Sequence, residues 1–195
     1  LMDPTLKNHS TEPTAICLDY LGFMLRKPLY DICLKNNKGF ILRSEVDGWR
    51  HLYYYDMNGK LKKQLTKGEW NVSDIKLVDE ENERVFFEAN KGDRLNTQLF
   101  VVDFDGDDIE QLTNIPGTHK GTVSPTGKYF YDSYSNINTP KKLDLYNDSG
   151  ELIKNLGDRK SKIFDEYNLG TTEIFSIKTE DGFDLPAMWV LPPDF

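Results

Sequence analysis

The sequence predicts an all-β chain assembled from repeats of one short-stranded unit, and three observations support this prediction. The first is a pattern that recurs three times: an alternating strand, a turn that ends in glycine, and a second strand that ends in leucine. The recurring pairs are Gly59 with Leu65, Gly106 with Leu112, and Gly150 with Leu156. The second is the spacing of these glycines, 47 and then 44 residues, which is typical of β-propeller blades. The third is an aromatic content of 12%, which favours strands over helices.

We therefore expect a partial β-propeller of about three four-stranded blades over residues 29–160. The three blades should occupy about 29–68, 69–117 and 118–157. Residues 1–28 show no clear period and are interrupted by prolines, so they are interpreted as an irregular segment or the remnant of a preceding blade.

Runs of alternating apolar and polar residues predict the strands of each blade. The runs are 39–45, 49–56 and 60–66 in the first blade, 72–78, 84–89, 97–103 and 108–113 in the second, and 121–123, 128–133, 142–146 and 151–155 in the third. Asn58-Gly59 is a strong hairpin signal because both residues accept a positive φ. We expect a positive φ at the three recurring glycines, and a smaller cost of substitution at Gly92, which lies outside the pattern.

The pattern changes after residue 157. Residues 158–168 are highly charged and could hold one helical turn, and 172–178 with 185–191 predict a β-hairpin, so 161–195 is interpreted as a linker and a separate hairpin. Three blades cannot close a ring, because propellers have at least four. We therefore expect either a fragment of a larger ring or a piece that assembles with something else.

Composition excludes several classes of function. A net charge of -8 argues against nucleic acid or an anionic membrane surface as a partner, and no apolar run is long enough to span a bilayer. Cys17 and Cys33 lie in apolar surroundings, so they are either buried thiols or, in an oxidising compartment, a disulfide. The three histidines are isolated from each other and from the cysteines, so neither a metal site nor a cofactor is predicted.

Several stretches suggest a site and also have a structural interpretation. Residues 103–108 look like a calcium loop, but their glycine is fourth rather than sixth, so we interpret them as a hairpin turn. His51 and His119 could be general bases, but no nucleophile accompanies them by motif, so we expect structural hydrogen bonds. The aromatic residues could form a binding platform or pack between blades, and alternation favours packing for Trp49, Trp70 and the run 53–55. Glycosylation sequons begin at Asn8, Asn71 and Asn147.

Five ordered motifs resemble the dipeptidyl peptidase IV family of prolyl-oligopeptidase-like serine peptidases, in which a propeller precedes an α/β-hydrolase domain. The motifs are Ser-Glu-Val-Asp-Gly-Trp-Arg-His-Leu-Tyr (44–53), Gln-Leu-Thr-Lys-Gly-Glu-Trp-Asn-Val (64–72), Ser-Pro-Thr-Gly-Lys-Tyr-Phe (124–130), Tyr-Ser-Asn-Ile-Asn-Thr-Pro (134–140) and Trp-Val-Leu-Pro-Pro-Asp-Phe (189–195). The resemblance covers about residues 39–195. One departure is Thr126, where the family usually has Asp, which should alter only the capping of that turn.

The resemblance implies release of N-terminal dipeptides after Pro or Ala through an acyl-enzyme. It also implies that 161–195 contains the first hairpin of the hydrolase domain, and that members are exported to the periplasm or secreted. The implied partners are the other blades and the hydrolase domain of the same protein, and a peptide substrate. A homodimer stays open.

The family's nucleophile lies in a Gly-x-Ser-x-Gly elbow, and none of the nine serines here is flanked in that way. No catalytic residue is therefore assigned, and we expect the chain alone to be inactive. Glu80-Glu81 resembles the acidic pair that binds the substrate ammonium in this family, but it lies between two predicted strands, so a solvated turn is expected and no substrate-binding residue is assigned. The alternative function is a stand-alone propeller module that binds a protein or ligand, which would have no reason to keep the last hairpin.

Overall fold

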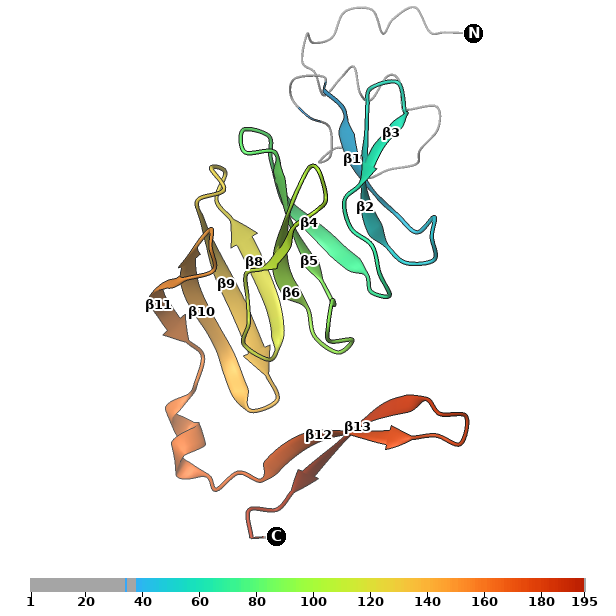
Figure 1. Cartoon of the computed structure of the whole chain (residues 1–195). Coiled ribbons are helices and arrows are strands. Elements are labelled where there is room, and N and C mark those ends of the chain that lie inside the picture. Colours follow the sequence, from blue (N-terminus) through green and yellow to red (C-terminus); the bar gives the residue numbers. More distant parts are fainter. Residues whose placement is uncertain (1–33, 35–37, 195) are drawn as a thin grey trace, which may run out of the picture.

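The computed structural model describes Leu34 and residues 38–194, which form four antiparallel sheets (Figure 1). The first sheet has three strands in the order β1-β2-β3: β1 (Phe40–Ser44), β2 (His51–Tyr55) and β3 (Leu61–Gln64). The irregular segment 1–28, residues 29–33 and 35–37 of the range predicted for the first blade, both cysteines and the sequon at Asn8 lie outside the described residues.

The second and third sheets have four strands each, in sequence order. The second contains β4 (Val72–Asp79), β5 (Arg84–Ala89), β6 (Gln98–Asp103) and β7 (Ile109–Gln111), and the third contains β8 (Thr118–Val123), β9 (Tyr129–Asn136), β10 (Thr139–Asn147) and β11 (Leu152–Asp158). These sheets confirm the predicted all-β fold of a partial propeller. The assignment of residue ranges to domains stays a prediction.

Beyond the third sheet, a 3-10 helix, η2 (Lys162–Glu166), begins after Ser161, whose side chain accepts a hydrogen bond from the Ile163 amide. The chain then forms β12 (Thr171–Lys178) and β13 (Asp184–Leu191), which pair only with each other among the described strands. The predicted helical turn and hairpin are both present. No helix in the described part of the chain is long and apolar enough to cross a membrane.

The core consists of two apolar layers between the first three sheets. Strand β5 contributes to both because consecutive side chains of a strand point to opposite faces. Phe87 packs in a cluster with Ile41 and Leu52 of the first sheet, whereas Phe86 packs in a cluster with Phe130 and Tyr146 of the third. The second sheet is therefore the central layer, buried on both faces.

The recurring glycines have a structural role beyond their turns. Gly106 and Gly150 have φ values of 73° and 75°, and each lies against the closing strand of the preceding sheet. A Cβ on Gly106 would lie 3.1 Å from the Leu65 Cα, and one on Gly150 would lie 2.7 Å from the Leu112 carbonyl oxygen. Each turn thus packs on the closing leucine of the repeat before it.

We expect Gly106→Ala and Gly150→Ala to destabilise the protein more than Gly59→Ala and Gly92→Ala. All four positions have a positive φ, which costs a non-glycine residue about 1–3 kcal/mol, but at Gly59 and Gly92 a Cβ would meet nothing within 4 Å. The lower cost expected for Gly92 from sequence is therefore revised, because its φ of 84° matches that of Gly59. Urea denaturation measures the four losses, and equal losses would contradict the contact with the preceding sheet.

Candidate functional site

The hairpin lies at one end of the three propeller sheets (Figure 1). The β1–β2, β5–β6 and β9–β10 turns all lie at the lower ends of their sheets in Figure 1, where the β12–β13 hairpin also lies. We call this the hairpin-side end and define it by residues 45–50, 90–97 and 137–138 with β12 and β13. Any site shared by the propeller and the hairpin has to lie here.

A polar cleft of about 500 Å³ lies at the hairpin-side end, between the first and second sheets. Two asparagines hold its walls together. The Asn71 amide donates to the Asn90 side-chain oxygen at 2.7 Å, and the Arg50 amide donates to the Asn71 side-chain oxygen at 2.9 Å. Trp49 and Arg94 line the same cleft. An aromatic ring and a guanidinium that line one cleft can bind a polar ligand or a chain segment.

A second cavity of about 590 Å³ lies between the β9–β10 turn and the base of the hairpin. Its apolar lining includes Ile137, Leu169 and Val190. One hydrogen bond crosses it, from the Asn138 side-chain nitrogen to the Thr172 carbonyl oxygen at 3.4 Å. The hairpin thus contacts the third sheet through a small, loosely packed junction.

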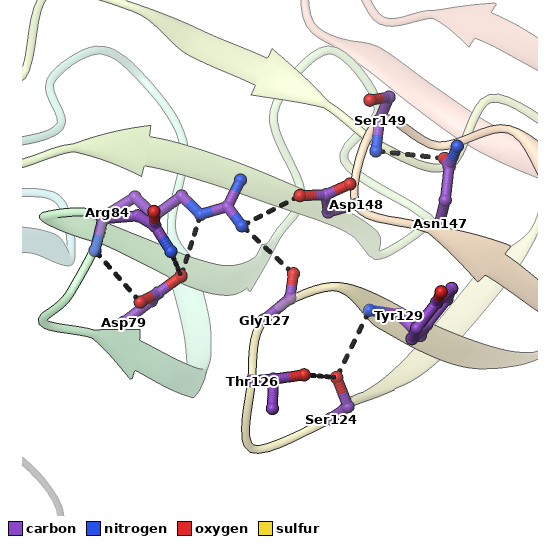
Figure 2. A network of polar contacts seen from close by, with 10 residues as sticks. Asp79, Arg84, Ser124, Thr126, Gly127, Tyr129, Asn147, Asp148 and Ser149 are labelled. Carbon is purple, nitrogen blue, oxygen red and sulfur yellow. Dashed lines mark hydrogen bonds and ion pairs between the residues drawn. The ribbon is translucent and has the colours of Figure 1, made fainter.

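The opposite end carries a polar joint around Arg84 (Figure 2). The Arg84 guanidinium lies 3.1 Å from Asp79 in its own sheet, and 3.0 Å from Asp148 and 3.2 Å from the Gly127 carbonyl oxygen in the third sheet. It also lies over the Phe86 ring, 5.0 Å from the centroid. These contacts link the second and third sheets, so the charges have a structural role.

The same joint shows how the departure at Thr126 is accommodated. The Ser124 hydroxyl lies 3.3 Å from the Thr126 hydroxyl and accepts a hydrogen bond from the Tyr129 amide at 3.2 Å (Figure 2). The two hydroxyls cap the β8–β9 turn. That the departure alters only this capping stays a prediction.

Burial by itself raises the pKa of the Asp79 carboxyl, but hydrogen bonds from Asn82 and Arg84 outweigh it and hold the pKa below its usual value. A carboxylate with a depressed folded-state pKa stabilises the protein fully above its unfolded pKa of about 3.9, and that contribution is lost as the pH falls through the folded value. Asp79 should therefore contribute at neutral pH and lose its contribution in acid.

Asp79→Asn is expected to lower the free energy of unfolding by about 1.5–3 kcal/mol at neutral pH, because the Arg84 guanidinium loses a charged hydrogen-bond partner. Urea denaturation between pH 7 and pH 3 should show the difference from the parent chain shrinking as Asp79 of the parent becomes protonated. Asp108→Asn, an exposed carboxylate, is the matched control. A difference that stays constant over this range would contradict the role of the Asp79 charge.

Both described histidines are buried and hydrogen-bonded, as predicted. The His51 ring bonds the Thr66 hydroxyl and the Gly68 carbonyl oxygen, and the His119 ring bonds Asp132 and the Ile115 carbonyl oxygen. Each ring has both nitrogens occupied within the protein. Neither can act as a general base on a substrate in this arrangement.

The suspected calcium loop is a plain turn between β6 and β7, with the Gly106 amide donating to the Asp103 carbonyl oxygen at 2.9 Å. Asp107 pairs with Lys63 of the preceding sheet at 3.1 Å. Glu80 and Glu81 lie in the β4–β5 turn, at the end opposite the hairpin. The turn interpretation therefore holds for both acidic stretches.

The aromatic residues agree with the prediction only in part. Trp70 and Tyr54 pack in the layer between the first two sheets, as predicted, whereas Tyr55 stacks on Phe40 of its own sheet with ring centroids 5.3 Å apart. Trp49 instead lines the cleft, because β2 begins only at His51 and alternation does not extend back to residue 49.

The asparagines of the two described sequons both take part in hydrogen bonds. The Asn71 side-chain oxygen accepts from the Arg50 backbone amide, and the Asn147 side-chain oxygen accepts from the Ser149 backbone amide within its turn.

Comparison with known proteins gives a consistent family match. The model of the dipeptidyl peptidase IV N-terminal region matches residues 13–141. Dipeptidyl peptidase 4 of Arthroderma otae is 31% identical over 157 residues, 78% of this chain and 20% of the relative. Dipeptidyl peptidase 4 of Trichophyton rubrum is 30% identical over 158 residues, with the same two coverages.

Solved structures show the same similarity. The crystal structure of Porphyromonas gingivalis dipeptidyl peptidase 4 matches with a TM-score of 0.74 and 25% identity, over 91% of this chain and 24% of that one. A putative dipeptidyl aminopeptidase IV from Bacteroides ovatus matches with a TM-score of 0.70 and 28% identity, over 81% and 25%. The chain spans about a fifth of the length of the curated relatives it matches.

Proposed function

Because the chain belongs to the dipeptidyl peptidase IV family and is a non-catalytic fragment of its N-terminal propeller region, we propose that it serves a serine peptidase that releases dipeptides from peptide N-termini after Pro or Ala. The family match over residues 13–141 is the observation that carries this proposal. It extends over all strands of the first two sheets and into the third.

The chemistry would come from a hydrolase domain of the same protein. Acyl transfer needs a serine activated by a histidine that an acid orients, and the hydrogen bonds of the two described histidines go to Thr66, Gly68, Asp132 and Ile115 rather than to a serine. We propose that the propeller restricts access and orients the peptide, and that the hairpin-side end faces the hydrolase domain.

The hairpin supports this orientation. Ile174, Met188 and Val190 are exposed on β12 and β13 although they are apolar, and a lone hairpin is only marginally stable in water. We propose that these side chains pack on the hydrolase domain in the whole protein. We further propose, from the family resemblance, that the protein acts in the periplasm or outside the cell.

The test uses the whole protein that contains this chain. It should release p-nitroaniline from Gly-Pro-p-nitroanilide and a dipeptide from a peptide with a free amino terminus, but nothing from the same peptide acetylated at its N-terminus. Cleavage of both peptides alike would contradict a propeller that orients the free N-terminus. No cleavage of either, with the folded protein binding another ligand, would favour the stand-alone binding module. Cell fractionation of the producing organism tests the location.

A further inference from the structure

The two described histidines differ in the kind of partner at Nδ1. At His51, Nε2 lies 2.8 Å from the Gly68 carbonyl oxygen, which only accepts, so this nitrogen carries a proton. Nδ1 lies 3.0 Å from the Thr66 hydroxyl. That hydroxyl accepts the Leu52 amide at 2.9 Å and keeps its own proton to donate. His51 is thus satisfied as a neutral ring with one proton.

The two partners of His119 are a carbonyl oxygen and a carboxyl group. Its Nε2 lies 2.7 Å from the Ile115 carbonyl oxygen, and its Nδ1 lies 2.6 Å from the Asp132 carboxylate. An ionised carboxylate and a carbonyl both accept only. While Asp132 is ionised, both bonds form together only when both ring nitrogens carry protons. The side chains of His119 and Asp132 are 1% and 0% exposed, so water does not replace either partner.

The surroundings favour a positive charge at this position. Asp144 lies directly opposite Asp132 in the β9–β10 register, and both carboxyls are buried. Like charges opposite each other destabilise a sheet. In the described part of the chain, no lysine or arginine forms an ion pair with either one. Asp144 accepts instead from the Asn155 amide nitrogen at 2.6 Å.

The remaining groups that face the pair do not supply this charge. Tyr134 of β9 stacks on the His119 ring with ring centroids 5.1 Å apart. Burial is the main cause that raises the pKa of Tyr134, and the charges of Asp144 and Asp132 add to it. Burial and the same aspartates raise the pKa of Tyr146 on β10 to about 12, so both phenols stay neutral. From the second sheet, Glu88 accepts the Gly121 amide and is neutralised by Lys76 at 3.0 Å.

We propose that His119 is a doubly protonated structural cation, and that its second proton binds the third sheet to the turn that precedes it. This turn, residues 115–117, joins β7 to β8 at the lower end of these strands in Figure 1. The Gln98 side chain donates to the Ile115 and Gly117 carbonyl oxygens, and the Asn136 side chain donates to the Pro116 carbonyl oxygen at 2.9 Å. Loss of the proton removes the bond to Asp132 or the bond to Ile115. The position of the turn therefore depends on this proton.

The direct test is nitrogen NMR of the chain labelled with ¹⁵N-histidine at about pH 7.5, where an ordinary histidine with a pKa of about 6.5 is mostly neutral. Signals are assigned with His51→Gln and His119→Gln. We expect N–H protons on both nitrogens of His119 and on Nε2 alone of His51, which serves as the internal control. A single proton on His119 would overturn the proposal, because Asp132 would then be the protonated partner.

Two matched variants separate the roles of the aspartates. Asp132→Asn removes the carboxylate that His119 contacts, so the ring should carry one proton at the same pH. Asp144→Asn leaves the His119–Asp132 bond in place, so the ring should still carry two protons. The reverse pattern would show that Asp144, and not Asp132, stabilises the second proton of the His119 ring, and it would contradict the proposal. If Asp132→Asn does not fold, the spectrum of the parent chain decides alone. These tests use the chain alone, so they are independent of the peptidase assay.

Discussion

The purified 195-residue chain is expected to show no enzymatic hydrolysis of Gly-Pro-p-nitroanilide. Any rate should lie roughly 10⁶-fold below that of a protein with an intact Ser-His-Asp triad. No serine of the sequence lies in a Gly-x-Ser-x-Gly elbow, and both described histidines have their ring nitrogens bonded inside the protein. Release of p-nitroaniline, followed by its absorbance, measures the rate.

The control for this assay is a serine-directed phosphonate. Residual turnover that the phosphonate leaves unchanged reports spontaneous hydrolysis, which agrees with the expectation. Turnover that copurifies with the chain, is blocked by the phosphonate and disappears in Ser124→Ala would show that a serine of this chain is a nucleophile.

Phe86→Ala and Phe87→Ala should each lower the free energy of unfolding by about 3–5 kcal/mol, because each removes a fully buried aromatic ring from a packed layer. The two residues are adjacent in β5 but serve different layers. Amide exchange should therefore show weaker protection of the third sheet in Phe86→Ala and of the first sheet in Phe87→Ala. Urea denaturation gives the two losses.

An exposed aromatic residue provides the control for these substitutions. Tyr131 lies on the outer face of the third sheet, and Tyr131→Ala should change the free energy of unfolding by no more than about 0.5 kcal/mol. Phe86→Leu and Phe87→Leu are milder replacements to use where the alanine variants do not fold. The same exchange pattern in both phenylalanine variants would contradict their separate layers.

Much of the fold could be predicted because its signals are local. Alternation placed β5 at residues 84–89, as observed, and the other strands within a few residues of their observed ends. Asn58-Gly59 specified its turn through backbone conformation alone, and Gly59 has a φ of 79°. Each of these features depends on residues that are neighbours in the chain.

The joints between sheets could not be predicted, since they depend on distant residues. Arg84 pairs with Asp148, 64 positions away, and the sequence around either residue does not indicate its partner. The same holds for the Glu88 contact with the Gly121 amide. The two histidines were predicted to be structural, but the difference between a hydroxyl and a carboxylate partner appears only when the strands are paired.

The turn that packs on the preceding leucine gives the array a direction. In the first two sheets the receiving residues, Leu65 and Leu112, are 1% exposed, whereas Leu156 of the third is 47% exposed. Each repeat thus has two different contact surfaces. Its glycine turn packs on the preceding repeat, and its closing leucine receives the turn of the following repeat. Contacts of this head-to-tail kind do not end by themselves: they close into a ring when the rotation between units fits, and otherwise continue as an open chain. The same two surfaces that order the blades within one molecule could therefore order molecules along a fibre if the ring were left unclosed.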